Sequence, residues 1–339
     1  MDGFLEGVRN FFKISFLPPR RMNWGYPVFL MSVGLLTAHL LRTILFRADV
    51  PFSPTSLVFN SLFVPFLTLI SLIIPAVTLS SSDRRLTSSG ICGEFTGVGP
   101  LILGLVSGIP LSLVYSSCHN FSSYLLLRFG GKMVFPEYMC YNTDTSKMTL
   151  ALEILTQNAI PAIGICLFFT GLLYTVLSDS NKILSTAVIV ALFGLYSLNL
   201  VDLPGTLLIG LWLLILRDRT GNVFAPFLAL LAKAGTDIAI TSILSKVDIT
   251  TLQTYSDIPS TVFYSSVPAI FVAFILFALL KSSLDDFDFT YRSDLLGRTS
   301  EEDPEDKKQN GEPFFKGLNP ALITGLIIII VLWVLMISA

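Results

Sequence analysis

Apolar stretches of about 20 residues, the length that spans a bilayer as an α-helix, recur along the whole chain between short polar segments. The pattern predicts membrane spans near residues 26–46, 55–79, 99–127, 148–178, 183–200, 203–217, 222–245, 261–281 and 319–337. The fourth stretch is too long for one straight span, and Pro161 near its middle predicts a kink or a break. The hydrophobic pattern therefore predicts an all-α, polytopic membrane helix bundle.

Polar segments divide the chain into four parts. Residues 1–25 place apolar side chains on one helical face and predict an amphipathic N-terminal segment on the cytoplasmic leaflet, with a disordered basic segment as the alternative. Residues 26–281 are expected to form the bundle, of about eight core spans by their hydrophobic lengths. Residues 282–318 contain SEEDPEDKKQNGEP and predict a charged cytoplasmic linker, which makes residues 319–339 an appended C-terminal transmembrane helix.

Composition supports a membrane location and excludes several functions. The chain is 53% hydrophobic and 14% charged, whereas a soluble domain carries about 25% charged residues. Its 22 Lys and Arg against 24 Asp and Glu leave no basic excess for a nucleic-acid partner, so membrane lipid is the expected surrounding partner. Only two histidines, His39 and His119, and four cysteines without a CxxC pair are present, so we expect no metal and no cofactor.

The distribution of basic residues predicts the orientation. Most Lys and Arg fall in the loops on the side that holds the N-terminus, which is the cytoplasmic side by the positive-inside rule. The sequence therefore predicts a multi-pass protein of the plasma (cytoplasmic) membrane with its N-terminus inside and its C-terminus outside.

Three consecutive predicted helices carry Phe, Gly and Pro residues at a recognisable spacing. PAIGICLFFTGLLYTVL contains Phe169-Thr170-Gly171, AVIVALFGLYSLNL contains Phe193 four residues before Ser197, and LLIGLWLLILRDRTGNVFAPFLALLAKAG contains a Gly-rich helix and a Pro-containing approach to the next. This order resembles the CAAX-protease and bacteriocin-processing family, which includes the type II CAAX prenyl endopeptidases. That family carries Glu-Glu-x-x-Phe-Arg-Gly, then Phe-x-x-x-His, then a His with an Asn four residues later. The resemblance implies a CAAX-protease-like core over residues 161–245.

The reactive positions of that family hold other residues in this chain. Under the alignment, the positions of the two glutamates, the arginine, the two histidines and the asparagine are occupied by Ile165, Cys166, Thr170, Ser197, Leu230 and Ala234. These side chains cannot together hold or polarise a water for hydrolysis, and neither histidine of the chain lies in these helices. The resemblance therefore implies a degenerate member with no catalytic residue at the family's positions.

Ionisable and amide side chains inside spans are further candidates, because a charged group at the bilayer centre costs about 2.5 to 3.5 kcal/mol on insertion scales. Lys233 and Asp237 are four residues apart and share a helix face. Glu153 begins the fourth span, while Asn199 and Asp202 end the fifth. These five residues predict a polar cavity; a structural ion pair and interfacial helix-end residues are the alternatives.

The hypothesis that follows is a catalytically inactive CAAX-protease-like membrane protein, a pseudoenzyme that binds a membrane protein, lipid or peptide as a scaffold or accessory subunit. One alternative is a small-solute or lipid transporter that uses the polar residues, although the chain shows no internal repeat. Another is an active endopeptidase of the family with a non-standard site. Cys166 or Ser197 would then need a neighbouring base, which the sequence does not offer nearby.

Overall fold

The structure is a computed structural model that describes residues 23–47, 57–80, 91–93, 97–130, 151–152, 154–177, 182–243, 261–285 and 319–338. The predicted amphipathic segment before residue 23 and the predicted linker after residue 285 lie outside these ranges. Glu153 also lies outside them.

The described secondary structure is helical, which confirms the predicted fold class, and each of the nine predicted stretches contains a helix. The elements are α2 (Gly25–Arg47), α3 (Leu57–Thr68), η1 (Leu69–Ile73), α4 (Ile74–Ser80), α6 (Val98–Gly130), η4 (Ile154–Ala159), α8 (Ile160–Ile165), η5 (Cys166–Leu173), α9 (Tyr174–Leu177), α10 (Lys182–Tyr196), α11 (Leu203–Thr220), α12 (Phe224–Ile243), α13 (Thr261–Asp285) and α16 (Pro320–Ser338). Among the described helices, five are long and apolar enough to cross a membrane by length and composition.

The fourth predicted span continues through Pro161 without a break. Pro161 is the second residue of α8 and lies inside a continuous helix, and both Ala159 and Cys166 on either side of α8 have right-handed helical backbone angles. The irregularity appears instead as two π-helical segments, η4 and η5, on the two sides of α8. Because π-helical turns are rare and often mark functional sites, η5 is a natural place to look for one.

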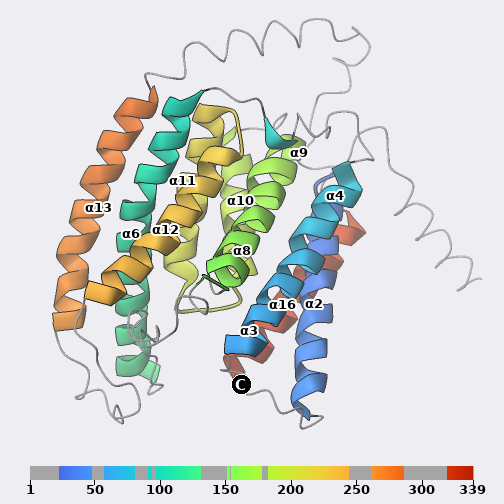
Figure 1. Ribbon diagram of the computed structural model, residues 1–339. Coiled ribbons are helices and arrows are strands. Elements are labelled where there is room, and N and C mark those ends of the chain that lie inside the picture. Colours follow the sequence, from blue (N-terminus) through green and yellow to red (C-terminus); the bar gives the residue numbers. More distant parts are fainter. Residues whose placement is uncertain are drawn as a thin grey trace, which may run out of the picture.

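Two groups of helices form the bundle (Figure 1). In one group, α6 packs against α11, α12 and α13; in the other, α2 packs against α16 and η1. The helix formed by η4, α8, η5 and α9 lies between the two groups and contacts both α3 and α12. α10 packs mainly along α11.

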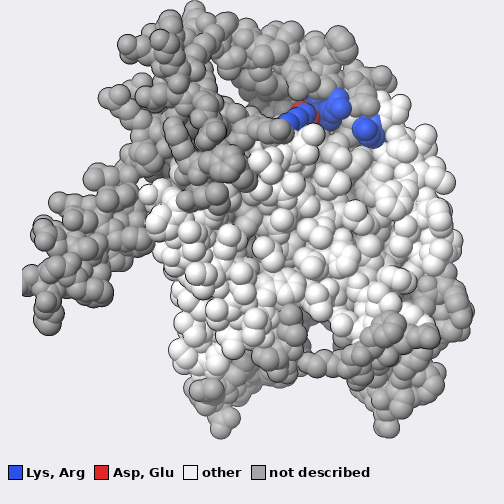
Figure 2. Space-filling view, turned by 180° about the vertical axis from the view of Figure 1, so that it is seen from behind, with Lys and Arg blue, Asp and Glu red and all other residues white. Residues whose placement is uncertain are grey.

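The surface and the core have the distribution expected of a bundle in lipid. Figure 2 shows an almost uniformly uncharged face, with Lys and Arg gathered near one end. Large apolar side chains such as Phe271 and Ile275 of α13 are more than half exposed on the outside. The core contains Phe168, Leu172 and Leu173 of η5 packed with Met31 and Leu35 of α2.

The C-terminal helix α16 follows the predicted linker in the sequence, but it packs against the rest of the bundle. Leu322, Ile329 and Leu332 are buried in the common core. A side chain at Gly325 would meet Ser32 Oγ at 2.8 Å, so α16 and α2 lie in close contact. The indole of Trp333 donates a 2.8 Å hydrogen bond to the carbonyl of Leu195 at the end of α10.

α6 and α12 approach closely where the sequence has Gly104 and Gly108. A Cβ at Gly104 would lie 2.5 Å from the carbonyl oxygen of Ala225, and one at Gly108 would lie 2.6 Å from the backbone nitrogen of Lys233. The two glycines therefore let the helix backbones touch, as expected of a small-xxx-small motif in a membrane. This contact sets the position of the polar side chains that follow along α6.

Candidate functional site

The candidate site residues predicted from the sequence lie mainly in two regions of the bundle. The first region is a small cavity between η5, α10 and α11. Its lining residues are Ile165, Phe169, Thr170, Ile189, Phe193, Gly210, Leu213 and Leu214. The cavity has a volume of about 10 Å³, which is close to the minimum for one water. Two aligned family positions, Ile165 and Thr170, thus meet at this cavity, which we call the residual cavity.

Aromatic side chains pack around the residual cavity. The rings of Phe169 and Phe193 meet edge to face with centroids 5.2 Å apart, and the ring of Tyr196 meets that of Phe169 in the same way at 5.8 Å. The hydroxyl of Thr170 donates a 2.8 Å hydrogen bond to the carbonyl of Cys166 within its own helix. Cys166 is only 2% exposed. The walls are therefore apolar and well packed.

The other aligned positions lie on α12 and after α10. Leu230 packs against the hydrophobic core and Ala234 is buried, both on α12, which contacts α8 and η5. Ser197 follows the last residue of α10, and its hydroxyl donates to the carbonyl of Gly194 at 2.7 Å. Ser197 thus belongs to the loop before α11, where polar residues gather. Within the described ranges, no group of three or more His, Cys, Asp and Glu side chains could hold a metal ion.

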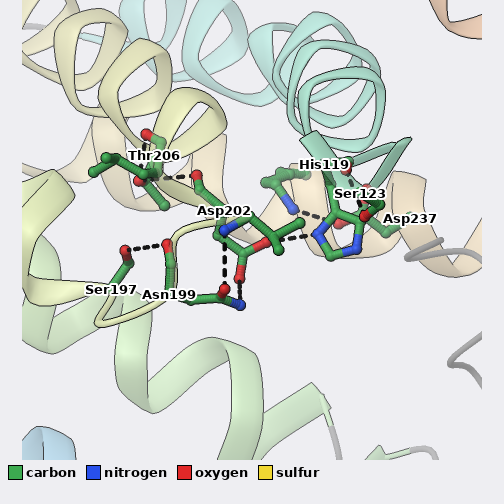
Figure 3. A network of polar contacts seen from close by, with 10 residues as sticks. His119, Ser123, Ser197, Asn199, Asp202, Thr206 and Asp237 are labelled. Atoms are coloured by element: carbon green, nitrogen blue, oxygen red, sulfur yellow. Dashed lines mark hydrogen bonds and ion pairs between the residues drawn. The ribbon is translucent and has the colours of Figure 1, made fainter. Parts of the chain in front are cut away.

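The second place is a group of polar contacts between α6, α11 and α12 (Figure 3). His119 of α6 and Asp202, just before α11, point toward each other, with 2.6 Å between Nδ1 and Oδ1. The side-chain amide of Asn199 donates to the other carboxylate oxygen of Asp202 at 2.5 Å. The side chains of His119 and Asp202 are only 11% and 18% exposed. Both oxygens of this carboxylate are therefore engaged within the protein.

The loop before α11 is built to present Asp202 to α6. Leu198 has a φ of 48°, an uncommon value for a bulky residue, while its side chain is buried in the core. Asn199 Oδ1 accepts a hydrogen bond from the N–H of Val201 at 3.0 Å and closes the turn. Asp202 occupies the N-cap position of α11 but makes no side-chain cap. Its carboxylate is instead directed to His119 and Asn199.

Lys233 and Asp237 of α12 form a buried ion pair farther along the same side of α6. Their Nζ and Oδ2 atoms are 2.7 Å apart, and the side chains are 13% and 5% exposed. The hydroxyl of Ser112 donates to the other oxygen of Asp237. The ammonium of Lys233 also lies 4.0 Å from the ring centroid of Tyr115, a cation–π contact. Packing and charge pairing together stabilise the cation in the bundle.

Tyr115 connects the two charged pairs, because its ring centroid lies 6.5 Å from that of His119. The connected side chains, which we call the polar column, are Ser112, Tyr115, His119, Asn199, Asp202, Lys233 and Asp237. From Ser112 to His119 the column follows α6 for seven residues, or about 10 Å at the α-helical rise. Beyond Ser112 the interface between α6 and α12 continues as the close contacts of Gly108 and Gly104 with α12.

The polar column contains four of the five residues predicted to line a polar cavity: Lys233, Asp237, Asn199 and Asp202. The fifth, Glu153, is outside the described residues. Sequence reasoning missed Ser112, Tyr115 and His119 as members. Their spacing of three and four residues, which places them on one helix face, is the signal that could have identified them.

Part of the chain matches a known protein family. Residues 147–232 match the family described as "Type II CAAX prenyl endopeptidase Rce1-like". The matched range contains the residual cavity and the loop of Asn199 and Asp202, and it ends one residue before Lys233. Comparison with curated proteins and with solved structures finds no match. The chain is therefore a helical membrane protein in which residues 147–232 are similar to the Rce1-like type II CAAX prenyl endopeptidases.

Proposed function

We propose that this protein is a catalytically silent Rce1-like membrane protein that acts as a binding scaffold or accessory subunit for a membrane-embedded partner, either a membrane protein, a lipid or a peptide. The observation that carries the proposal is the residual cavity. Ile165 and Thr170 stand there where the aligned family has a glutamate and the arginine, and Phe169 and Phe193 line it beside them. Hydrolysis of a peptide bond needs a positioned water and a group that activates it.

The chemistry around the residual cavity supports a binding role over hydrolysis. The hydroxyl of Thr170 is used inside its helix, and the cavity is near the minimum volume for one water. The charged side chains of the polar column lie on other helices and are already paired with each other. A scaffold needs only the bundle and its lipid-facing surface, both of which are retained.

A cleavage assay tests the catalytic half of this proposal. The purified full-length protein is incubated in detergent with a prenylated CAAX peptide, with and without added zinc. We expect no product above a protein-free control. Zinc-dependent turnover that a chelator abolishes would contradict the proposal. Turnover lost in Cys166→Ala or Ser197→Ala would instead identify an active endopeptidase with a non-standard site.

A partner assay tests the binding half. A photoreactive amino acid placed on the lipid-facing surface of α13 at Phe271 should form a defined cross-linked product in native membrane, and the same substitution at Ile183 of α10 serves as a comparison on another face. Cross-linking only to scattered lipid and protein at every tested face would count against a scaffold with a specific partner.

Lipid or solute transport is the second candidate, and the polar column is the observation that favours it. Ionisable residues inside a bundle commonly mark substrate or ion pathways. Against a through path, the backbone of α6 at Gly108 lies in close contact with α12 just beyond Ser112. Fluorescent-phospholipid scrambling in proteoliposomes should equal that of protein-free vesicles. Scrambling that disappears in a Lys233→Met/Asp237→Leu double variant would make transport the better reading.

We further infer that the end of the bundle containing Lys182, Arg217 and Arg219 faces the cytoplasm of a plasma-membrane protein. These residues stand where α10 begins and α11 ends, and Lys182 pairs with Asp218 at 2.6 Å. Basic residues at one end of the spans favour the cytoplasmic side. In this orientation α16 runs toward the outside and the C-terminus is external. Protease protection of a C-terminal tag in sealed inside-out vesicles checks it.

A further inference from the structure

Residues 197–202, which we call the α10–α11 turn, join the polar column to the group of helices that contains α2 and α16. The last residue of the turn, Asp202, carries the carboxylate that faces His119, and Asn199 supplies the second donor to that carboxylate. Figure 3 shows the turn running from Ser197 to Asp202, with His119 of α6 opposite. The position of Asp202 therefore depends on the conformation of this turn.

Leu198 makes the conformation of the α10–α11 turn a strained one. Among the described residues other than glycine, Leu198 alone has a positive φ, of 48°. Its side chain is buried in the common core, so the backbone cannot relax without moving a packed residue. A left-handed backbone is unfavourable for a residue with a Cβ, and such strain persists only where the surrounding structure imposes it. The turn must therefore be held by contacts from neighbouring elements.

Trp333 of α16 supplies such a contact where the chain leaves α10. Its indole N–H donates a 2.8 Å hydrogen bond to the carbonyl of Leu195. The same carbonyl accepts the N–H of Leu198 at 3.4 Å. Because the last carbonyls of a helix lack partners within their own helix, an indole donor at this point fixes the direction in which the chain continues. One oxygen thus receives both the strained residue and the C-terminal helix.

Tyr196, the last residue of α10, ties the same point to η1. Its hydroxyl forms a 3.3 Å hydrogen bond with Ser71 Oγ of η1. Its ring meets that of Phe169 edge to face. Both α16 and η1 pack against α2. The group of helices around α2 therefore holds the beginning of the turn, while the end of the turn presents Asp202 to α6.

We propose that α16 is a regulatory element that sets the position of Asp202 through the α10–α11 turn, with Trp333 as its positioning residue. Each step of the path is a contact: Trp333 bonds to Leu195, Leu195 bonds to Leu198, and the turn that Leu198 begins ends at Asp202. Coupling between distant sites is carried by such continuous chains of packed and hydrogen-bonded groups. A shift of α16 on α2 therefore loosens the turn and releases Asp202 from His119.

This inference concerns the polar column and is independent of what the scaffold binds, so its test reads the imidazole of His119 directly. The chain has two histidines, and in a His39→Gln background His119 is the single imidazole. NMR of the full-length protein with isotope-labelled histidine in micelles then gives the signals of its two ring nitrogens. Asp202→Ala removes the carboxylate and provides the Nδ1 signal of His119 without it. The position of the signal between these two references measures how far Asp202 is engaged.

Trp333→Phe keeps a ring on α16 and removes the indole donor. It should lower the ratio of engaged to released Asp202 by about fivefold, the factor that corresponds to a hydrogen bond of about 1 kcal/mol, and so move the Nδ1 signal toward that of Asp202→Ala. Trp212→Phe is the matched control. The buried indole nitrogen of Trp212 has no hydrogen-bond partner within the described part of the chain, so its loss should leave the signal unchanged.

Gly325→Val perturbs the same path and leaves Trp333 in place. A Cβ at Gly325 would lie 2.8 Å from Ser32 Oγ and 3.0 Å from the Cα of Phe29, so α16 must move on α2 to accept it. We expect the His119 signal to move in the same direction as in Trp333→Phe. Size-exclusion profiles and melting temperatures establish that each variant is folded.

Two results would overturn the proposal. One is an unmoved His119 signal in folded Trp333→Phe and Gly325→Val, which would show that α16 does not reach the polar column. The other is an equal movement in Trp212→Phe, which would show that the signal follows a general loosening of the bundle.

Discussion

The residual cavity and the polar column are neighbours in the bundle but are built on opposite principles. At the residual cavity, Phe169 and Phe193 fill the space around two aligned family positions, and the hydroxyl of Thr170 bonds within its own helix. Along the polar column, His119 and Lys233 each face a carboxylate on a helix or loop of the bundle. The first place resembles ordinary core, whereas the second concentrates the interactions that are most costly to disrupt in a membrane.

The difference shows where substitution is tolerated. An apolar wall can change one methyl group at a time, because packing losses are graded with volume. A buried ion pair cannot lose one member without leaving a charge in a medium of low dielectric. We therefore expect the two places to respond differently to single and double substitutions, and four measurements of unfolding in mixed detergent micelles can test this.

The largest effect is expected at the buried pair of the polar column. Lys233→Met should destabilise the protein by about 3 to 5 kcal/mol, because it leaves the carboxylate of Asp237 buried without its cation. The double variant Lys233→Met/Asp237→Leu should recover most of this loss. Lys182→Met is the control, because its pair with Asp218 has a 59% exposed lysine and should lose about 1 kcal/mol or less. Equal losses in the single and double variants would contradict a coupled buried pair.

A loss of stability of similar size is expected at the residual cavity, where there is no charged partner whose removal would restore it. Phe169→Ala should cost about 3 to 5 kcal/mol, because the buried ring contacts both Phe193 and Tyr196 and leaves a void when removed. Phe271→Ala, on the exposed face of α13, is the matched control and should change unfolding little in detergent. A small loss at Phe169 would mean that the cavity is looser than its walls indicate.

A smaller effect is expected where α6 and α12 touch. Gly108→Ala should destabilise by about 1 to 3 kcal/mol, as overpacking does, because the new Cβ would press on the backbone of Ala232 and Lys233. Gly235→Ala on α12 is the control. No atom lies within 4 Å of its added Cβ, so the better helix propensity of Ala should stabilise the protein by about 0.5 to 1 kcal/mol. The opposite order of stabilities would argue against the close crossing.

The smallest effect is expected at the more exposed end of the column. His119→Gln should cost about 1 to 2 kcal/mol, because it removes one charge-assisted hydrogen bond while Asn199 still donates to Asp202. Asp202→Asn should cost a similar amount, and the two changes together should cost less than their sum because they share one contact. Full additivity would show that His119 and Asp202 act independently.

Sequence reasoning located the helices and the Rce1-like segment, but it described the chemistry of that segment only in part. The positions of Ile165 and Thr170 were predicted from the family frame, and the structure places both at one cavity. The partner of Asp202 was not predicted, because His119 is 83 residues away in the sequence and lies on another helix. Periodicity reports which face a residue occupies, but not which other helix meets that face.

The sequence by itself determined that this chain is a helical membrane protein, because runs of apolar residues are stable only in lipid and must satisfy their backbone within helices. It also determined that Lys233 and Asp237 share a face, since the helical repeat is local. Only the tertiary structure decided that Tyr115 joins this pair to His119 and that Arg217 fastens Ile91 beside Thr170. These contacts depend on how helices cross, and crossing is set by close packing among many side chains at once.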